Sequence, residues 1–560
     1  MDPNLWGIVA GDRDDEVAAL IRLAPGAAPP PGVRIVTRFG EVATCRLARG
    51  AILAVRDHPA VRSLKAARAL VPEPAAATLP RHRTRAGRGA APWTGRGSLV
   101  GVIDWGCDVG HPNFLDERGR TRLVALWDQR PSRRRPPEPY GYGVVHDRRA
   151  IDRALASGDP FAALAYDPAD VDVDDHGTHG THVVDIAAGR PVCGAGGVAP
   201  GADLAFVHLA MHERGPRNIA SSVTLLEAID FIANAAGGRP WVINLSLGSH
   251  AGPHDGSTLV ELALDACVDA GPGRVIVQSV GNYFRRPIHA TGVLEVGVRT
   301  TLAWLVDPTD ETPNELDLWY GGSDRAIVYL FSPSGRRVVA AAPDSHGALV
   351  YDGAVIGRFG HRTADPNNGD NQVTLIVDPV VGGRWRVVIE PIRVERGDFH
   401  VWVERDEATP GSQSRLARSQ ISQQTTTNSI SNGHRTITVG GYDRRTGEIA
   451  RFSSAGPTRD GRQKPDLLAP GVAITAARSA GRDGGGPELT VKSGTSMAAP
   501  HVTGTIALLY EAAGRALSID EVRDILERTC ARMRDPRAGW GRLDIAAATA
   551  AARSLQRPEA

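Results

Sequence analysis

A change of texture in the second half of the chain limits the folds that it can adopt. Residues 99–103, 241–245 and 274–280 form short apolar runs, typical of parallel strands that helices cover on both faces. Between residue 292 and about residue 428 the pattern changes to short strands rich in β-branched and aromatic residues, separated by Gly, Pro and Asn turns. A helix-rich α/β pattern then resumes. The sequence therefore predicts an α/β, doubly wound, mostly parallel sheet into which an antiparallel β-sandwich is inserted.

A small α+β unit is predicted ahead of the α/β domain. It has strands near 17–23, 33–36, 42–47 and 60–64 and a helix near 51–56. The Ala/Pro-rich, basic tract at 66–96 is typical of an exposed linker that proteases can cut. We expect five segments: an α+β unit (1–75), a linker (76–98), the first part of the α/β domain (99–292), the inserted sandwich (293–430) and the second part of the α/β domain (431–560).

Composition argues against several classes of partner. The chain has 64 Lys plus Arg and 63 Asp plus Glu, a net charge of +1, which disfavours nucleic acid and anionic membranes as partners. No apolar run is long enough to span a bilayer, and no secretory signal is visible at the N-terminus. Five scattered cysteines predict neither a disulfide framework nor a zinc site. We therefore expect a cytoplasmic location.

Residues 494–501 hold a Ser among small residues, directly before an apolar run of helical length. This pattern places Ser496 at a loop-to-helix junction, where unpaired N–H groups and the helix dipole favour a developing oxyanion. The alternative is an ordinary N-cap residue before a buried helix. Because an unassisted Ser is a poor nucleophile, its assignment depends on a base elsewhere in the chain.

Three other parts of the chain offer the groups that such a Ser needs. Asp104 ends one strand-like run, where its carboxylate could orient a base. Asn282 follows another such run, where its amide could bind an oxyanion. The alternative for both is an ordinary turn residue. His176, His179 and His182 offer a base that titrates near neutral pH. The three histidines could instead bind a metal, although no carboxylate ligand at metal-site spacing supports that alternative.

The sequence around these residues resembles the subtilisin-like serine proteases. The order Asp, His, Ser is the subtilisin order, which is itself a standard worked example of the triad. The matching motifs lie within residues 99–292 and 433–548, and they are VIDWG (102–106), HGTHV (179–183), NLSLG (244–248), VGN (280–282), FSSAGPT (452–458), KPDLLAPG (464–471), GTSMAAP (494–500) and GWGRLD (539–544).

The resemblance implies a serine endopeptidase that hydrolyses polypeptide substrates. Ser496 would be the nucleophile, His179 the base and Asp104 its orienting carboxylate, with Asn282 as the oxyanion donor. His176 is the weaker candidate for the base, because only His179 has the family's downstream context. The resemblance also implies that an extended substrate pairs with a strand at Ser246, Leu247 and Gly248, and that further substrate contacts come from Ser279, Val280 and Gly281.

Two departures from the family's pattern concern specificity and calcium. Asp185 stands where the family usually has Gly, and Val280 where a small Ala is common, which predicts a narrowed specificity pocket. The family's strong calcium site uses an acid shortly after the catalytic Asp. Asn113 takes that place here, and the loop at 190–197 has no acidic or amide side chain. We therefore expect no cofactor and no bound calcium.

The segment at 122–156 and the inserted sandwich resemble the bacterial Csp-like subtilases that carry a jelly-roll domain. The N-terminal α+β unit is similar to their propeptide, which implies an intramolecular partner that is cut off by autoprocessing between about residues 64 and 96. Two alternatives come from other functional classes. The chain could be a catalytically silent scaffold, or an interaction protein whose sandwich has the main function.

Overall fold

The computed structural model describes residues 3–9, 15–72, 84–85, 92–172, 176–194, 196–210, 221–378, 381–406, 411–480 and 488–556. The chain divides into two compact units. The first unit comprises Met1–Ala67, Ser249–Leu262 and Tyr283–Ile430, and the second comprises Arg68–Gly248, Ala263–Asn282 and Ser431–Ala560. None of the helices in the described part is both long enough and apolar enough to cross a membrane.

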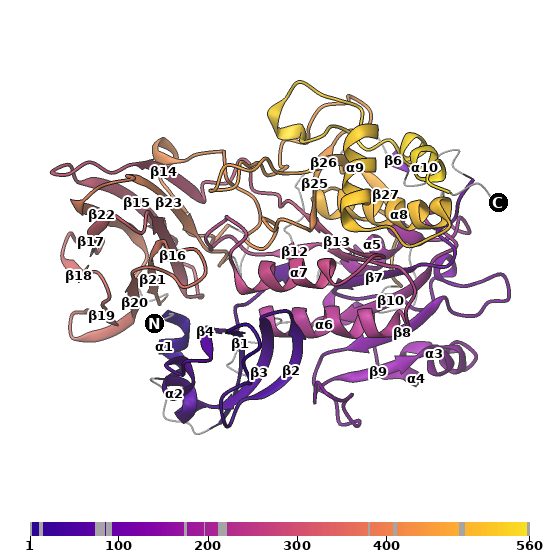
Figure 1. Ribbon diagram of the computed structural model, residues 1–560, viewed down its shortest axis with the longest axis horizontal. Helices are drawn as coiled ribbons and strands as arrows, with labels where there is room; N and C mark the ends of the chain where they lie inside the picture. Colours follow the sequence, from indigo (N-terminus) through magenta and orange to yellow (C-terminus); the bar gives the residue numbers. More distant parts are fainter. Residues whose placement is uncertain are drawn as a thin grey trace. The chain divides into compact units, whose positions relative to one another are not determined.

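The second unit is built around an eight-stranded sheet (Figure 1). Neighbouring strands are parallel, except that β9 runs antiparallel to β8. The predicted doubly wound, mostly parallel sheet is thereby confirmed. The strands, in spatial order, are β26 (Leu467–Pro470), β25 (Ile437–Tyr442), β13 (Arg274–Ser279), β11 (Trp241–Leu245), β7 (Leu99–Asp104), β10 (Asp203–His208), β8 (Leu123–Asp128) and β9 (Val144–Asp147).

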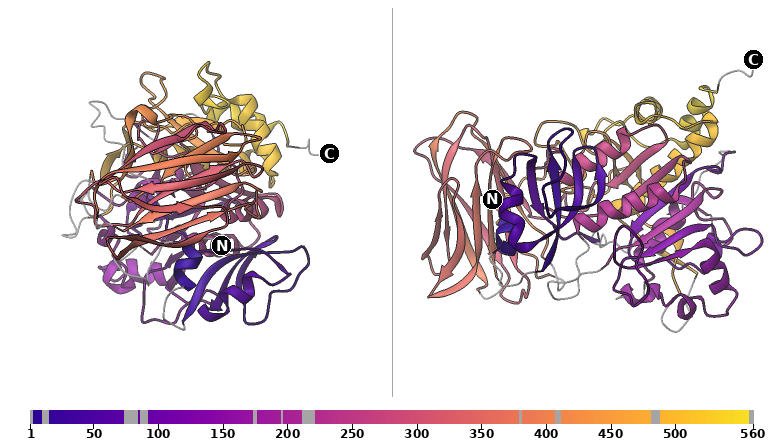
Figure 2. Two further views of the ribbon diagram at one scale, coloured as in Figure 1. Left: turned by 90° about the vertical axis from the view of Figure 1, so that its left-hand side faces the viewer. Right: turned by 60° about the horizontal axis from the view of Figure 1, so that its bottom comes forward.

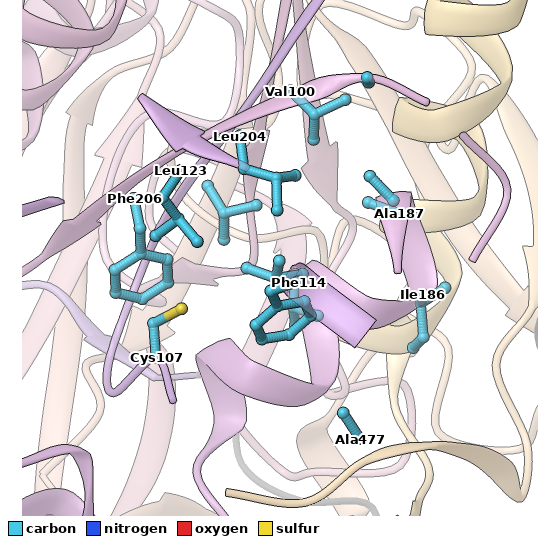
Figure 3. Packing of buried hydrophobic residues seen from close by; sticks show 14 of the residues in the cluster. Val100, Cys107, Phe114, Leu123, Ile186, Ala187, Leu204, Phe206 and Ala477 are labelled. Atoms are coloured by element: carbon cyan, nitrogen blue, oxygen red, sulfur yellow. The ribbon is translucent and has the colours of Figure 1, made fainter. Parts of the chain in front are cut away.

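Helices cover both faces of this sheet. Successive residues of a strand point to opposite faces. Val100 and Val102 of β7 pack in one core with residues of α5 (His179–Ala188) and α8 (Thr495–Ala513), as Figure 3 shows for Val100, Ile186 and Ala187. Gly101 faces the other side, where a Cβ atom would lie 2.5 Å from Ile232 of α6 (Ser222–Ala235). The second unit also contains α3 (Arg148–Leu155), α4 (Pro160–Leu164), α9 (Ile519–Thr529), α10 (Ile545–Arg553) and most of α7 (Leu259–Asp269), whose first residues belong to the other unit.

The first unit contains the predicted antiparallel sandwich, whose two layers are seen edge-on in the right-hand view of Figure 2. Trp304 and Trp385 of one sheet and Leu316 and Val401 of the other are fully buried in one core. One sheet has the order β14 (His289–Val293), β23 (Asp398–Val403), β16 (Asn314–Tyr320), β21 (Asn371–Val377), β20 (Ala354–Arg362) and β19 (His346–Tyr351). The other has the order β18 (Arg337–Ala341), β17 (Arg325–Phe331), β22 (Gly383–Arg393), β15 (Thr300–Val306) and β24 (Arg415–Leu416).

The N-terminal part of the first unit is a four-stranded antiparallel sheet in the order β2-β3-β1-β4. Its strands and its helix α2 lie where the sequence predicts them, whereas α1 (Pro3–Val9) was not predicted. Lys65 connects this sheet to the sandwich through an ion pair of 2.8 Å with the buried Asp365, whose pKa is lowered by Lys65 and Arg362 despite burial. The elements are β1 (Glu16–Leu23), β2 (Arg34–Phe39), β3 (Val42–Ala48), α2 (Ile52–Arg56) and β4 (Val61–Ala66).

The sequence predicts that the tract at 66–96 is an exposed linker, but two of its segments pair with strands elsewhere in the chain. Its backbone forms β5 (Val71–Pro72), which pairs antiparallel with β12 (Leu247–Gly248). It also forms β6 (Thr84–Arg85), which lies parallel to β27 (Ile474–Ala477) in a small sheet completed by β28 (Leu489–Lys492). These strands depend on backbone partners far away in the sequence, which composition cannot reveal. Residues 73–83 and 86–91 lie outside the described residues.

We expect Gly101→Ala to lower the free energy of unfolding by about 1–3 kcal/mol, because the new methyl group would overlap Ile232 across a packed core. Urea denaturation measures the effect. In the double variant Gly101→Ala/Ile232→Ala the methyl group occupies space that the smaller side chain vacates, so the double variant should be more stable than the sum of the single effects predicts. Strict additivity would contradict the proposed packing.

Candidate active site

The sequence-predicted residues of the second unit come from element ends at the carboxyl edge of the parallel sheet. Asp104 is the last residue of β7, and Asn282 lies shortly after the end of β13. His179 opens α5, and Ser496 is the second residue of α8. Sites of open α/β sheets form at this edge, because the strand ends and the N-termini of the following helices meet there.

Asp104 and His179 form a direct pair. The Nδ1 atom of His179 lies 2.8 Å and 2.9 Å from the two carboxylate oxygens of Asp104, which is completely buried. The backbone N–H of Trp105 donates a further hydrogen bond of 2.7 Å to the same carboxylate. A carboxylate partner favours the tautomer with its proton on Nδ1, and in that neutral tautomer Nε2 is an acceptor.

The other two histidines of the motif do not join this pair. His176 is exposed, and its backbone N–H donates to Asp172. His182 is buried with Nε2 3.1 Å from the carbonyl oxygen of Ile474, and burial lowers its pKa well below the ordinary value. Within the described ranges no three His, Cys, Asp or Glu side chains are arranged to hold a metal ion. The three histidines therefore do not form a common site.

Ser496 is not an N-cap residue, which was the structural alternative for it. The N-cap of α8 is Gly494, and no side chain caps this helix end. The Ser496 hydroxyl is buried and has no hydrogen-bond partner among the described residues. Pro500 has no N–H to donate to the Ser496 carbonyl, which is instead 3.4 Å from the Ser246 hydroxyl. Ser246 thus supports the first turn of α8.

Asn282 has a fixed orientation, which a simple turn residue would not need. Its Oδ1 atom accepts hydrogen bonds from the backbone N–H and the hydroxyl of Thr495, at 2.9 Å and 3.0 Å. The amide nitrogen therefore points away from Thr495, and a Cβ atom on Gly494 would lie only 3.3 Å from it. Sequence reasoning did not single out Thr495; its position directly before Ser496 was the available signal.

The sequence analysis also did not identify a pair of residues beside Asp104, His208 and Tyr166. His208 ends β10 and lies opposite Asp104 in the sheet register. Its Nδ1 atom is 3.1 Å from the hydroxyl of Tyr166, and burial lowers the pKa of His208 to about 3, so its ring is neutral. Tyr166 is fully buried and accepts the backbone N–H of Cys107. The order of the strands, which the sequence does not state, places His208 beside Asp104.

The strand predicted to bind substrate is paired with the chain's own residues 68–72. In the β5–β12 ladder, Pro72 is opposite Leu247 and Val71 is opposite Gly248. On the other side, the N–H of Ser222 donates to the carbonyl of Arg68 at 2.9 Å, and the N–H of Arg68 donates to the Ser222 hydroxyl at 3.1 Å. The segment 68–72 therefore has backbone partners on two sides: β12 on one and Ser222 on the other. The other predicted substrate contacts, Ser279, Val280 and Gly281, lie buried at the end of β13.

The structure corrects the interpretation of Asp185 as a residue that narrows the specificity pocket. Its buried carboxylate accepts hydrogen bonds from the side-chain amide of Asn113 at 2.8 Å and from the N–H of Ala477 at 2.7 Å. Burial raises its pKa to about 6. Gly189 faces it so closely that a Cβ atom there would lie 1.7 Å from the carboxylate. Asp185 is therefore a structural residue of the adjacent loop.

Calcium, which the sequence already disfavours at this loop, does not fit the residues present. The amide of Asn113 is already used, since Oδ1 accepts the N–H of Cys193 at 2.7 Å and Nδ2 donates to its carbonyl at 3.0 Å. The buried guanidinium of Arg122 donates to the carbonyl oxygens of Asn113, Ala188 and Ala202. Burial lowers the pKa of Arg122 to about 10, so it remains a cation at neutral pH. Oxygens that a metal could bind are thus held by a protein cation.

Comparisons with known proteins identify a matching family, similar sequences and a similar structure. The profile of the subtilase family matches residues 95–331 and 404–541, more than half of the chain. The structure of the Clostridium perfringens CspB protease is similar with a TM-score of 0.69 and 25% identity, over 83% of this chain and 96% of that one. The subtilisin-like protease SBT2.1 of Arabidopsis thaliana is 24% identical over 76% of this chain. The serine protease AprX of Bacillus subtilis is 38% identical over 16% of this chain. These matches span 56% of the Arabidopsis protein and 21% of the Bacillus protein.

Proposed function

Because the chain belongs to the subtilase family, we propose that it is a serine endopeptidase in which Ser496 is the nucleophile, His179 the general base and Asp104 the orienting carboxylate. The observation that carries this proposal is the hydrogen bond from Nδ1 of His179 to the buried Asp104. The bond holds the ring in the tautomer that can accept a proton at Nε2. The Ser496 hydroxyl, which is buried and has no hydrogen-bond partner among the described residues, supports the same assignment.

The reaction then follows from the roles of these groups. His179 takes the proton of Ser496 as the hydroxyl oxygen attacks the carbonyl carbon of the scissile peptide bond. The oxyanion accepts hydrogen bonds from the Ser496 N–H and from the amide of Asn282, which Thr495 holds in position. His179 returns the proton to the leaving amine, and water hydrolyses the acyl-enzyme.

An extended polypeptide is the substrate in this proposal. Main-chain hydrogen bonds to the strand at Ser246, Leu247 and Gly248 would hold it, as in other cases where a peptide adds a strand to a sheet edge. Ser279, Val280 and Gly281 would contribute further contacts. The pairing of Val71 and Pro72 with β12 supports this role, since it demonstrates that the strand accepts an extended chain.

We also propose that the N-terminal α+β part is a propeptide. Its tail, residues 68–72, occupies the strand that a substrate would use and would therefore inhibit the enzyme. Since Pro72 is still part of the ladder, the autoprocessing cut is expected after Pro72 and before Arg96. The alternative is a catalytically silent scaffold, which would neither hydrolyse peptides nor react with a fluorophosphonate.

The enzyme is further proposed to work without calcium, because Arg122 supplies an internal cation to the carbonyl oxygens of residues 113, 188 and 202. A guanidinium has fixed donors that match several oxygens at once, and it cannot be removed by a chelator.

Ser496→Ala is expected to lower peptide hydrolysis by about 10⁴-fold or more, because the nucleophile is lost while binding remains. Ser493→Ala is the matched control: its hydroxyl accepts the N–H of Ala473, and it should leave the turnover of a peptide-library substrate nearly unchanged. Labelling by a fluorophosphonate should disappear only in Ser496→Ala. A Ser496→Ala protein as active as the wild type would refute the assignment, and an inactive, unlabelled wild type would favour the silent scaffold.

Autoprocessing predicts that intact mass spectrometry finds a cut between residues 72 and 96 in the wild-type chain and no cut in Ser496→Ala. A cut at the same bond in both proteins would mean that another protease makes it. A cut before Val71 would contradict the use of residues 68–72 as the substrate-like tail.

The melting temperature of the wild type should be the same with EDTA and with added calcium. Arg122→Met is expected to cost about 3–5 kcal/mol of stability, because it removes the charged donor of three buried carbonyl oxygens, although the Asn113 oxygen keeps the N–H of Arg190, and calcium should not restore it. Arg120→Met, at a 59% exposed side chain, is the control and should change stability by less than about 0.5 kcal/mol. A large drop in melting temperature with EDTA would refute the proposal.

A further inference from the structure

The loop at residues 105–108 follows Asp104 and contacts the start of α5, where His179 lies. The N–H of Trp105, the first residue of the loop, donates to the Asp104 carboxylate at 2.7 Å. Two further hydrogen bonds join the loop to the helix start on either side of His179: from the N–H of Gly180 to the carbonyl of Trp105 (2.9 Å), and from the Thr178 hydroxyl to the carbonyl of Gly106 (3.1 Å). One loop is thus bonded to the carboxylate and to the helix that carries the base.

The loop and the helix start are in close contact. A Cβ atom on Gly106 would lie 2.6 Å from the side chain of Thr178, and a Cβ atom on Gly180 would lie 2.5 Å from the carbonyl oxygen of Gly106. Packing this close transmits displacements from one element to the next. A shift of the loop would therefore also move the helix start and, with it, the ring of His179.

Two buried side chains, Tyr166 and His208, bind N–H groups of this loop. The N–H of Cys107 donates to the Tyr166 hydroxyl at 2.8 Å, and the N–H of Gly106 points to Nδ1 of His208 at 3.4 Å. The Tyr166 hydroxyl lies 3.1 Å from the same Nδ1 atom. Burial raises the pKa of Tyr166 well above its ordinary value and lowers the pKa of His208 to about 3, so both groups are neutral. The hydroxyl therefore accepts from Cys107 and donates its own proton to Nδ1.

The Tyr166 side chain is itself held in place. Tyr166 follows α4, and its backbone N–H donates to the carbonyl of Phe161 at 3.0 Å. The guanidinium of Arg130 lies over the Tyr166 ring, 5.2 Å from the centroid, and is paired with Asp128 at 3.0 Å. Because both the backbone and the ring are restrained, the hydroxyl is a fixed acceptor for the N–H of Cys107.

We propose that Tyr166 is a positioning residue for the Asp104–His179 pair, because its hydroxyl holds the loop on which the geometry of that pair depends. His208 shares this role by accepting the hydroxyl proton, which leaves an oxygen lone pair for the Cys107 N–H. This inference rests on the proposed endopeptidase function. Small displacements of reacting groups have large effects on rate, so the residues that support a site contribute to its activity.

Tyr166→Phe in the full chain removes only the hydroxyl. It should lower kcat for a peptide that the wild type cleaves about tenfold, the factor that corresponds to one lost buried hydrogen bond, and leave KM within about twofold of the wild type. The rate of fluorophosphonate labelling should fall by the same factor, because labelling uses the same base. An unchanged kcat, or a change confined to KM, would overturn the proposal.

Tyr140→Phe is the matched control. Tyr140 is also a buried residue of the second unit, but its hydroxyl donates to Asp230 at 2.7 Å and not to the 105–108 loop. Its loss should change kcat by less than about twofold. An equal loss of kcat in the two Phe variants would mean that removal of any buried tyrosine hydroxyl has this effect, and it would overturn the proposal.

A double variant separates positioning of the pair from a general effect on the fold. Tyr166→Phe is combined with Asp104→Ala, in which no pair is left to position. Groups that act as one unit have non-additive effects. Tyr166→Phe should therefore lower the residual hydrolysis of Asp104→Ala by less than about twofold. A further tenfold loss in this background would show that Tyr166 acts elsewhere, which contradicts the proposal.

His208→Asn and His208→Leu give a measurement that needs no Tyr166 variant. The amide oxygen of Asn can accept the Tyr166 hydroxyl proton in place of Nδ1, whereas Leu offers no acceptor. The kcat of His208→Asn should therefore be about threefold or more above that of His208→Leu, and equal values would overturn the proposal. A wild type that neither labels nor hydrolyses peptides would instead refute the proposed function itself.

Discussion

A carboxylate that is completely buried has to be paired, and Asp104 meets this requirement at the end of a central strand. Its partners are the Trp105 N–H and the His179 ring, so burial of the charge and orientation of the base are one interaction. The ring of His179 can be placed in this way because α5 begins at that residue. The end of β7 and the start of α5 thus supply the pair, while Asn282 follows β13 and Ser496 lies in the first turn of α8.

The groups at element ends could be predicted from the sequence, because local patterns mark where strands stop and helices start. Asp104, His179, Asn282 and Ser496 all belong to this class, and the sandwich was recognised from its turns and β-branched runs. What could not be predicted depends on contacts between distant segments. The pairing of residues 71–72 with β12 is one example. Asp185 is another. Its structural role follows from the hydrogen bonds that it accepts from Asn113 and Ala477, which are far from it in the sequence.

In the loop beside α5, a buried side-chain cation binds several backbone oxygens. Arg122 joins three carbonyl oxygens that belong to separate parts of the chain, and Asn113 closes the loop at Cys193. A comparable device acts on helix α8, where one oxygen of Glu511 accepts the N–H groups of Thr94, Gly95 and Arg96. In both, one side chain binds several backbone groups, which attaches these loops to the folded core.

The ladder between β5 and β12 has a kinetic consequence. A tail that remains joined to the chain competes for the strand at an effective concentration set by its tether, in the millimolar range for short connections, and not by the amount of protein in solution. Dilution cannot relieve such competition, whereas cutting the tether turns it into an ordinary bimolecular equilibrium. Under the proposed function, the onset of activity would therefore be governed first by an event within one molecule, with a rate independent of protein concentration, and afterwards by escape of the severed segment.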